Sequence, residues 1–218
     1  MWAEAEAWFE AHKRTLRGAG IELRARLMPD SGLMSSYANG VVRLALPDAE
    51  TPAGALRRAL FAATLRLSER EVGWLFGAML PRLVAHEIGH ALRDEAGRLG
   101  PDPWWEEQAA DRMACLLSRP HLGLSVRARA VTMLEPVVDA LGGLAEALAG
   151  YRHPDLAKGR GRLCSVRPTA VPDAARYRDF ATFQRMSVAW SYLDLMLDPE
   201  DSFDDYRNDM LLARRSDA

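Results

Sequence analysis

Cysteine and long apolar runs are both scarce in this chain of 218 residues. Two cysteines, Cys115 and Cys164, are too few for the disulfide framework that holds small secreted domains together. No uncharged apolar run reaches the roughly 18 residues that a membrane helix needs, and the nearest candidate, residues 72–85, is too short. We therefore expect a soluble protein from a reducing compartment, with Cys115 as a small buried residue.

A strong net charge is also missing, since 28 basic and 30 acidic residues leave a net charge of −2. This balance argues against a general nucleic-acid binder, so we expect no direct nucleic-acid contact. The first ten residues, MWAEAEAWFE, lack the basic segment and apolar core of a signal peptide, so we expect a cytoplasmic protein. The length of 218 residues is enough for one sizeable domain or two small ones, and the apolar content of 49% supports a hydrophobic core.

The most informative stretch begins with His86-Glu87-Ile88-Gly89-His90. Residues four apart share one face of an α-helix, so both imidazoles can be directed at one point. Glu87 lies about 100° round the helix, too far to be a ligand but close enough to reach a water bound at that point. Gly89 lies beside the ligand face, where the missing side chain allows a close approach. The opposite side carries an apolar stripe that would bury the helix: Val84, Ala85, Ile88, Ala91 and Leu92.

A second predicted helix follows after a short connection. Asp102 suits the N-cap position and Pro103 suits the first helical position. Glu107 and Asp111 are then four apart on one face. Two small residues on this helix would let it pack near the first one: Ala110 and Ala114.

Together the two helices predict a zinc site. A catalytic zinc has three protein ligands and one open position. We expect His86, His90 and Glu107 to be those ligands, and Asp111 to accept a hydrogen bond from the far nitrogen of a ligand histidine. The five-residue histidine pattern alone is weak, and without it Glu107 and Asp111 would indicate only a solvated charged face.

The sequence HEIGHAL followed by E-x-x-A-D-R-M-A resembles the gluzincin clan of zinc metallopeptidases. The short gap between His90 and Glu107, the pair Leu116-Leu117 and Pro120 are most similar to the ImmA/IrrE-type family of soluble bacterial proteases, which cleave or control transcriptional repressors. Membrane-bound gluzincin peptidases and compact minigluzincins are other relatives. The resemblance covers roughly residues 80–120, and the long apolar lead-in at residues 71–80 departs from the ImmA/IrrE pattern.

The resemblance implies a zinc-dependent endopeptidase that hydrolyses peptide bonds of a protein regulator, with Glu87 as general base toward a metal-bound water. It also implies a donor that stabilises the oxyanion of the transition state. The residues do not choose among four candidates for this donor: Tyr151, His153, Tyr177 and Tyr192. His12 and His121 lie outside the pattern, and we expect them to be surface or capping residues.

Two other functions compete with the peptidase. A non-catalytic regulatory or scaffold protein with the gluzincin fold would bind a protein partner and carry a structural metal or none. Glu87 favours the enzyme, because a purely structural site would not need a general base. A di-iron helical protein would need more carboxylates at Glu-x-x-His spacing than the chain contains. The sequence leaves the oligomeric state open.

Hydrophobic periodicity predicts an α+β fold that is mostly helical. After a helix at residues 2–18, we expect a small antiparallel sheet beside the metal helix, with Asn39-Gly40 as a hairpin turn. Its strands would lie at residues 21–27, 33–37 and 41–46. In zincins an edge strand of the sheet can pair with an extended substrate, and we assign that edge to residues 40–46.

Two helices are predicted between the sheet and the metal helix. Thr51 would cap a helix over residues 52–67, and Ser68 would cap the next one in a capping box with Glu71. Pro81 should kink or restart this helix before the histidines.

The chain after Pro120 is predicted to be helical at residues 126–148 and 174–197. A basic loop at residues 150–173 separates them and is a lid, a partner-binding segment or a plain linker. The acidic tail from Asp198 should be mobile at its end. We expect two units, divided in the sequence as follows: a zincin-like core over residues 1–120, and a helical C-terminal subdomain over residues 121–218 that completes the cleft.

Overall fold

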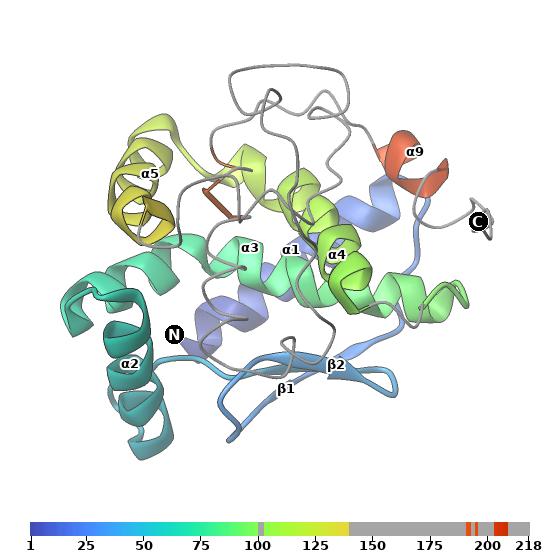
Figure 1. Ribbon diagram of the computed structural model, residues 1–218. Coiled ribbons are helices and arrows are strands. Elements are labelled where there is room, and N and C mark those ends of the chain that lie inside the picture. Colours follow the sequence, from blue (N-terminus) through green and yellow to red (C-terminus); the bar gives the residue numbers. More distant parts are fainter. Residues whose placement is uncertain (100–102, 140–190, 193–194, 196–202, 209–218) are drawn as a thin grey trace.

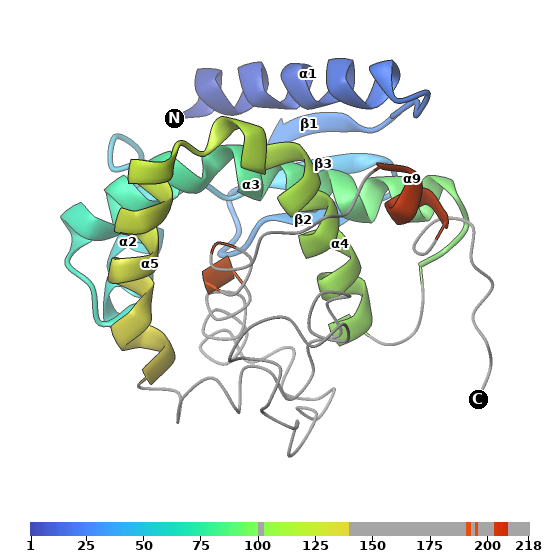
Figure 2. The ribbon, with the colours of Figure 1, turned by 90° about the horizontal axis from the view of Figure 1, so that it is seen from above.

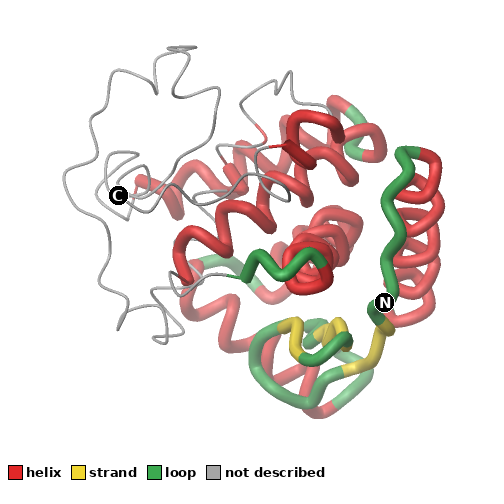
Figure 3. The backbone as a smooth tube through the Cα atoms, turned by 90° about the vertical axis from the view of Figure 1, so that its right-hand side faces the viewer, coloured by secondary structure: helices red, strands yellow, loops and turns green. Residues whose placement is uncertain are grey.

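The computed structural model of the chain describes residues 1–99, 103–139, 191–192, 195 and 203–208. It confirms an α+β fold that is mostly helical, with a three-stranded sheet (Figure 1). The strands gather at one side of the helical body (Figure 3). Among the helices of the described ranges, none is long and apolar enough to cross a membrane.

The longest described helix, α3 (Glu69–Glu95), is the element around which the others pack. It lies between α1 (Trp2–Gly18) and α4 (Pro103–Ser118) (Figure 2). Its predicted apolar stripe is buried, with exposures of 0–3% from Val84 to Leu92. Because side chains from α1, β3 and α4 share one core cluster with this stripe, the position of α3 is fixed on several sides.

Helix α3 continues through Pro81 instead of restarting there. Its start is as predicted, because Ser68 and Glu71 form the reciprocal capping box. A proline inside a helix removes one hydrogen bond and costs about 3 kcal/mol. The neighbouring residues Leu80 and Val84 are 1% and 0% exposed, so tertiary burial on both sides of Pro81 outweighs that cost.

The sheet is mixed, where the sequence predicted an antiparallel one. Strand β2 (Ser36–Ala38) pairs with β3 (Val41–Leu44) antiparallel through the predicted Asn39-Gly40 turn. Both turn residues have positive φ, 50° and 73°, as this hairpin requires. Strand β1 (Arg26–Pro29), however, pairs with β3 in parallel, and the chain between these two strands, residues 30–40, includes β2.

The strand order β1-β3-β2 overturns the edge assignment made from the sequence. Residues 40–46 contain β3, which has a neighbour on each side and therefore cannot accept a further strand. Strand β3 is buried on both faces, because the successive residues Val41 and Val42 point to opposite sides and are 7% and 0% exposed, as expected for a central strand.

Residues 21–25 alternate in burial as predicted but are not a strand. Ile21, Leu23 and Ala25 are buried, yet regular pairing begins only at residue 26. Oε1 of Glu95, at the end of α3, accepts the backbone N–H groups of Arg24 and Ala25 at 2.9 and 3.0 Å. A side chain thus takes the place of a neighbouring strand and ties this segment to α3.

Helix α2 (Pro52–Leu65) begins as predicted, with Thr51 as its N-cap and Pro52 at its first position. After α4 come a short 3-10 helix, η1 (Arg119–His121), and α5 (Leu124–Asp139), which includes Pro136. The predicted helix at 126–148 is therefore described as far as residue 139. The predicted loop at 150–173 and most of the predicted helix at 174–197 lie outside the described residues.

The acidic tail contributes a residue to the core that the sequence did not indicate. Helix α9 (Phe203–Tyr206) places Tyr206 at 0% exposure in the core cluster of α1, α3 and α4. The guanidinium of Arg207 donates to the carbonyl oxygen of Ala19, next to the end of α1. The tail is thus fixed at residues 203–207.

His12 is buried, which contradicts the prediction that it lies at the surface or caps a helix. It is 0% exposed on α1, and Nε2 donates to the carbonyl oxygen of Pro81 on α3 at 2.8 Å. The rings of Trp8 and His121 lie beside it. Helical period places His12 between the buried Phe9 and Leu16, so a polar residue occupies the core face. His121 is exposed, as predicted.

We expect His12 to make the fold sensitive to acid. Burial, with a further contribution from His121, lowers the pKa of His12 from 6.5 to about 4. The unfolded chain then binds the proton more readily, so stability present above pH 6.5 falls by about 3 kcal/mol between pH 6.5 and 4. Chemical denaturation across this range should show a loss that His12→Gln lacks and that His121→Gln keeps. An equal pH dependence in both variants would contradict the assignment.

Candidate metal centre

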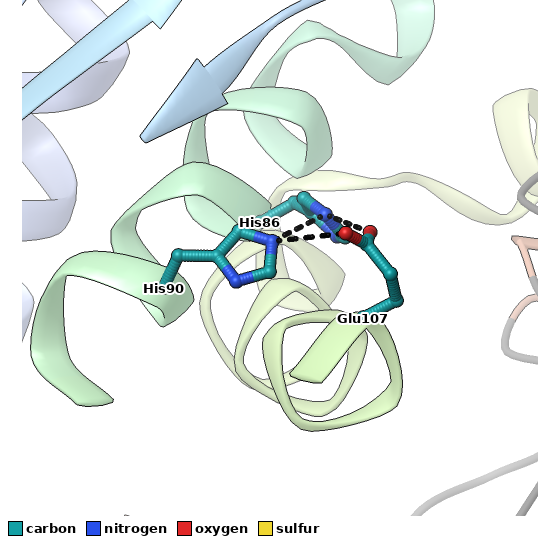
Figure 4. Close-up of side chains that lie close together, drawn as sticks. All are labelled: His86, His90 and Glu107. Carbon is teal, nitrogen blue, oxygen red and sulfur yellow. Dashed lines mark hydrogen bonds and ion pairs between the residues drawn. The ribbon is translucent and has the colours of Figure 1, made fainter. Parts of the chain in front are cut away.

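The structure brings His86, His90 and Glu107 together (Figure 4). The two histidines lie one turn apart on α3, and Glu107 approaches them from α4. Nε2 of His86 lies 3.2 Å from Nε2 of His90 and 3.0 Å from Oε2 of Glu107. Nε2 of His90 lies 3.6 Å from Oε1 of Glu107. Three side chains from two helices thus present their donor atoms to one point.

These separations fit a tetrahedral zinc ion. Zinc–nitrogen and zinc–oxygen bonds near 2.0–2.1 Å place neighbouring ligand atoms about 3.3 Å apart around a tetrahedral ion. The separations of 3.0, 3.2 and 3.6 Å lie on either side of that value, with the two histidines facing different oxygens of the Glu107 carboxylate. Two imidazoles and one carboxylate are also a ligand set that zinc prefers. These three residues could therefore hold a metal ion.

Gly89 lets the two helices approach closely enough to form this group. A Cβ atom at Gly89 would lie 2.7 Å from Cα and 3.0 Å from the carbonyl oxygen of Ala110 on α4. Ala110 and Ala114 are both 0% exposed at this contact. The contact agrees with the prediction that the glycine and the small residues of the second helix serve close packing.

Asp111 lies behind His86, as expected for a residue that orients a ligand. Its Oδ1 accepts from Nδ1 of His86 at 2.9 Å, which directs Nε2 toward Glu107 and His90. The same oxygen accepts from Nη1 of Arg82 at 3.0 Å. Burial alone would raise the pKa of Asp111, but Arg82 and His86 outweigh burial and lower it. Asp111 is therefore an ionised acceptor.

Arg82 also belongs to this group, although the sequence did not indicate it. It is 6% exposed and lies four residues before His86, on the same face of α3. The spacing Arg-x-x-x-His was visible in the sequence. Its partner was not, because Asp111 is 29 residues away.

If all carboxyl groups of the centre are ionised, its described charged groups carry a net charge of −2. Glu87, Glu107 and Asp111 bring three buried carboxyl groups together, and Arg82 brings one permanent cation. If all three carboxyl groups are ionised, one divalent cation balances the remainder.

Protons on the histidines are the alternative source of positive charge. Burial disfavours the charged form of His86, but hydrogen bonds with Asp111 and Glu107 outweigh burial and raise its pKa well above 6.5. Burial would also raise the pKa of Glu107, but His90 and His86 outweigh it and lower this pKa strongly. A metal ion would therefore compete with a proton at Nε2 of His86.

Glu87 is buried beside these residues. It is 4% exposed, and burial raises its pKa despite the nearby histidines. Within the described part of the chain, its Oε2 atom is buried without a hydrogen-bond partner. A buried carboxylate oxygen without a partner is costly, and such atoms occur where a water or substrate binds.

The four oxyanion candidates remain untested. Tyr151, His153 and Tyr177 lie outside the described residues. Tyr192 is described as a helical residue that is 5% exposed, and its role stays a prediction. The predicted N-cap, Asp102, also lies outside the described residues.

A second buried ion pair, which includes none of the three proposed ligands, joins α3 and α4. Nε and Nη2 of Arg93 donate to the two carboxylate oxygens of Glu106 at 2.6 and 2.8 Å. The two side chains are 5% and 9% exposed. Nη2 of Arg93 also donates to the carbonyl oxygen of Arg98, beyond the end of α3. This pair ties the end of α3 to α4, and nothing in the sequence indicated it.

Comparison with known proteins finds no matching family model, curated protein or solved structure. The resemblance to gluzincin peptidases therefore depends on the residues of the two helices. The geometry of those residues is the observation on which a function can be argued.

Proposed function

We propose that the chain is a zinc-dependent endopeptidase in which His86, His90 and Glu107 hold the ion and Glu87 is the general base. The observation that carries this proposal is the convergence of two imidazole nitrogens and the carboxylate of Glu107, with separations of 3.0–3.6 Å, next to a glutamate oxygen that is buried without a partner among the described residues. A structural zinc site needs a fourth protein ligand and no base. Three ligands with a neighbouring carboxylate favour hydrolysis.

A bound zinc ion would supply Lewis acidity and lower the pKa of a water at the open position. Glu87 would take a proton from that water and deliver it to the leaving amine. Its side chain is 4% exposed and its Oε2 atom has no hydrogen-bond partner among the described residues, so this oxygen can accept the proton. Asp111 would keep His86 in the tautomer whose Nε2 faces the ion.

The proposed substrate is a peptide segment of a protein, in keeping with the resemblance to proteases that act on regulators. Strand β2 offers an edge for an extended peptide, since it pairs only with β3 among the described residues. Tyr37 of β2 donates to Oδ2 of Asp94 at 2.6 Å, one helical turn beyond His90. This contact ties the strand to the helix that carries the histidines.

Metal analysis tests the proposal. We expect purified protein, dialysed against zinc and then against buffer, to keep about one zinc ion per chain. His90→Ala should lose tight binding, because two protein ligands remain. His121→Ala, which removes an exposed histidine, should bind like the wild type. Wild-type protein that takes up no zinc when it is offered in excess would overturn the proposal.

A further inference from the structure

A row of polar side chains runs along the facing sides of α3 and α4. On α3 the row consists of Arg82, His86 and His90, spaced four residues apart. On α4 it consists of Glu107 and Asp111, also four apart. Glu107 contacts both histidines, and Asp111 contacts His86 and Arg82. Arg82 is thus at the end of the row opposite to the proposed ligand His90.

Oδ1 of Asp111 is the atom that joins Arg82 to His86. It accepts from Nη1 of Arg82 at 3.0 Å and from Nδ1 of His86 at 2.9 Å. The other carboxylate oxygen, Oδ2, is buried and has no hydrogen-bond partner among the described residues. The terminal torsion of an aspartate is soft, so hydrogen bonds decide how the carboxylate is turned. In this structure the hydrogen bonds from Arg82 and His86 both end on Oδ1.

We propose that Arg82 is a positioning residue of the metal centre, which holds Oδ1 of Asp111 in the place where it orients the ring of His86. Nε2 of His86 then faces the ion. The inference rests on the proposed function, because it requires a metal ion at His86, His90 and Glu107. Arg82 acts on the ion through Asp111 and does not ligate it, since a guanidinium carries no lone pair for a metal.

The Arg93–Glu106 pair provides a matched comparison on the same two helices. Both arginines are buried on α3, at 6% and 4% exposure. Arg93 donates to both oxygens of Glu106, and neither of these bonds involves a proposed ligand. Arg82 instead shares its acceptor oxygen with His86. Loss of either arginine breaks a buried ion pair, but only loss of Arg82 should change the metal centre.

Zinc affinity, measured by competition with a chromophoric chelator, tests the inference. We expect Arg82→Met to weaken zinc binding by about 10- to 100-fold, the usual effect of losing a partner that orients a ligand. The direction is informative, because removal of a positive charge near a cation would by itself strengthen binding. Arg93→Met should lower the melting temperature of the protein and leave zinc affinity unchanged.

A second measurement asks whether Arg82 acts through Asp111. In an Asp111→Ala background the same Arg82→Met change should cause no further loss of affinity, because its target is gone. Equal weakening in both backgrounds, or wild-type affinity in Arg82→Met, would overturn the inference. If Arg82→Met does not fold, Arg82→Gln replaces it, with a smaller expected loss of zinc affinity, because its shorter side chain still carries N–H donors. Failure of the wild type to bind zinc would instead overturn the proposed function.

Discussion

Glu87→Gln should reduce peptide hydrolysis by about 10²- to 10⁴-fold, the usual contribution of a general base, and should keep about one zinc ion per chain. Glutamine has nearly the shape of glutamate but cannot accept the proton. Glu87 contributes no donor atom to the group of His86, His90 and Glu107, so zinc uptake should survive. Its burial and raised pKa support a role in proton transfer.

The measurement pairs hydrolysis of internally quenched peptides with metal analysis of the same samples. Glu69→Gln is the matched control, because Glu69 lies exposed at the start of the same helix. It should retain both activity and zinc. If Glu87→Gln hydrolyses peptides as fast as the wild type, Glu87 is not the base. If wild-type protein binds zinc and a protein partner but hydrolyses nothing, the non-catalytic regulatory alternative is favoured.

The parts of the centre that could be predicted from the sequence depend on the period of one helix. His86 and His90 are four apart, and Gly89 is next to them, so their common face follows from helical geometry alone. The positions of Glu107 and Asp111 depend in addition on where a second helix packs along the first one. The sequence indicated the helix and its small residues, and the structure places Ala110 against Gly89.

The parts that could not be predicted depend on partners far apart in the chain. His12 lies 69 residues from Pro81, and Arg24 lies 71 residues from Glu95. A polar residue on a core face looks like a surface residue until its partner is known, and this is why His12 was assigned wrongly. The strand order could not be predicted for the same reason. Alternating burial is visible at residues 21–27, but the parallel pairing of β1 with β3 depends on the path of the chain between them.

Gly89→Ala should destabilise the protein and weaken its zinc binding, although alanine is the better helix former. The new Cβ atom would lie 2.7 Å from the backbone of Ala110, so α3 and α4 must separate. Overpacking of this kind costs about 1–3 kcal/mol, and separation moves Glu107 away from the histidines. The loss should exceed the gain of about 0.5–1 kcal/mol in helix propensity.

Gly77→Ala isolates that gain, because it makes the same change in the same helix where a Cβ atom meets nothing within 4 Å. It should raise the unfolding free energy by about 0.5–1 kcal/mol and leave zinc affinity unchanged. Denaturant unfolding should therefore show that Gly77→Ala raises the unfolding free energy and that Gly89→Ala lowers it. Chelator competition should show weaker zinc binding in Gly89→Ala alone. If both variants are stabilised and bind zinc equally well, the close contact at Gly89 does not hold Glu107 at the histidines. The ligand group would then have to depend on other contacts between α3 and α4, such as the buried Arg82–Asp111 pair.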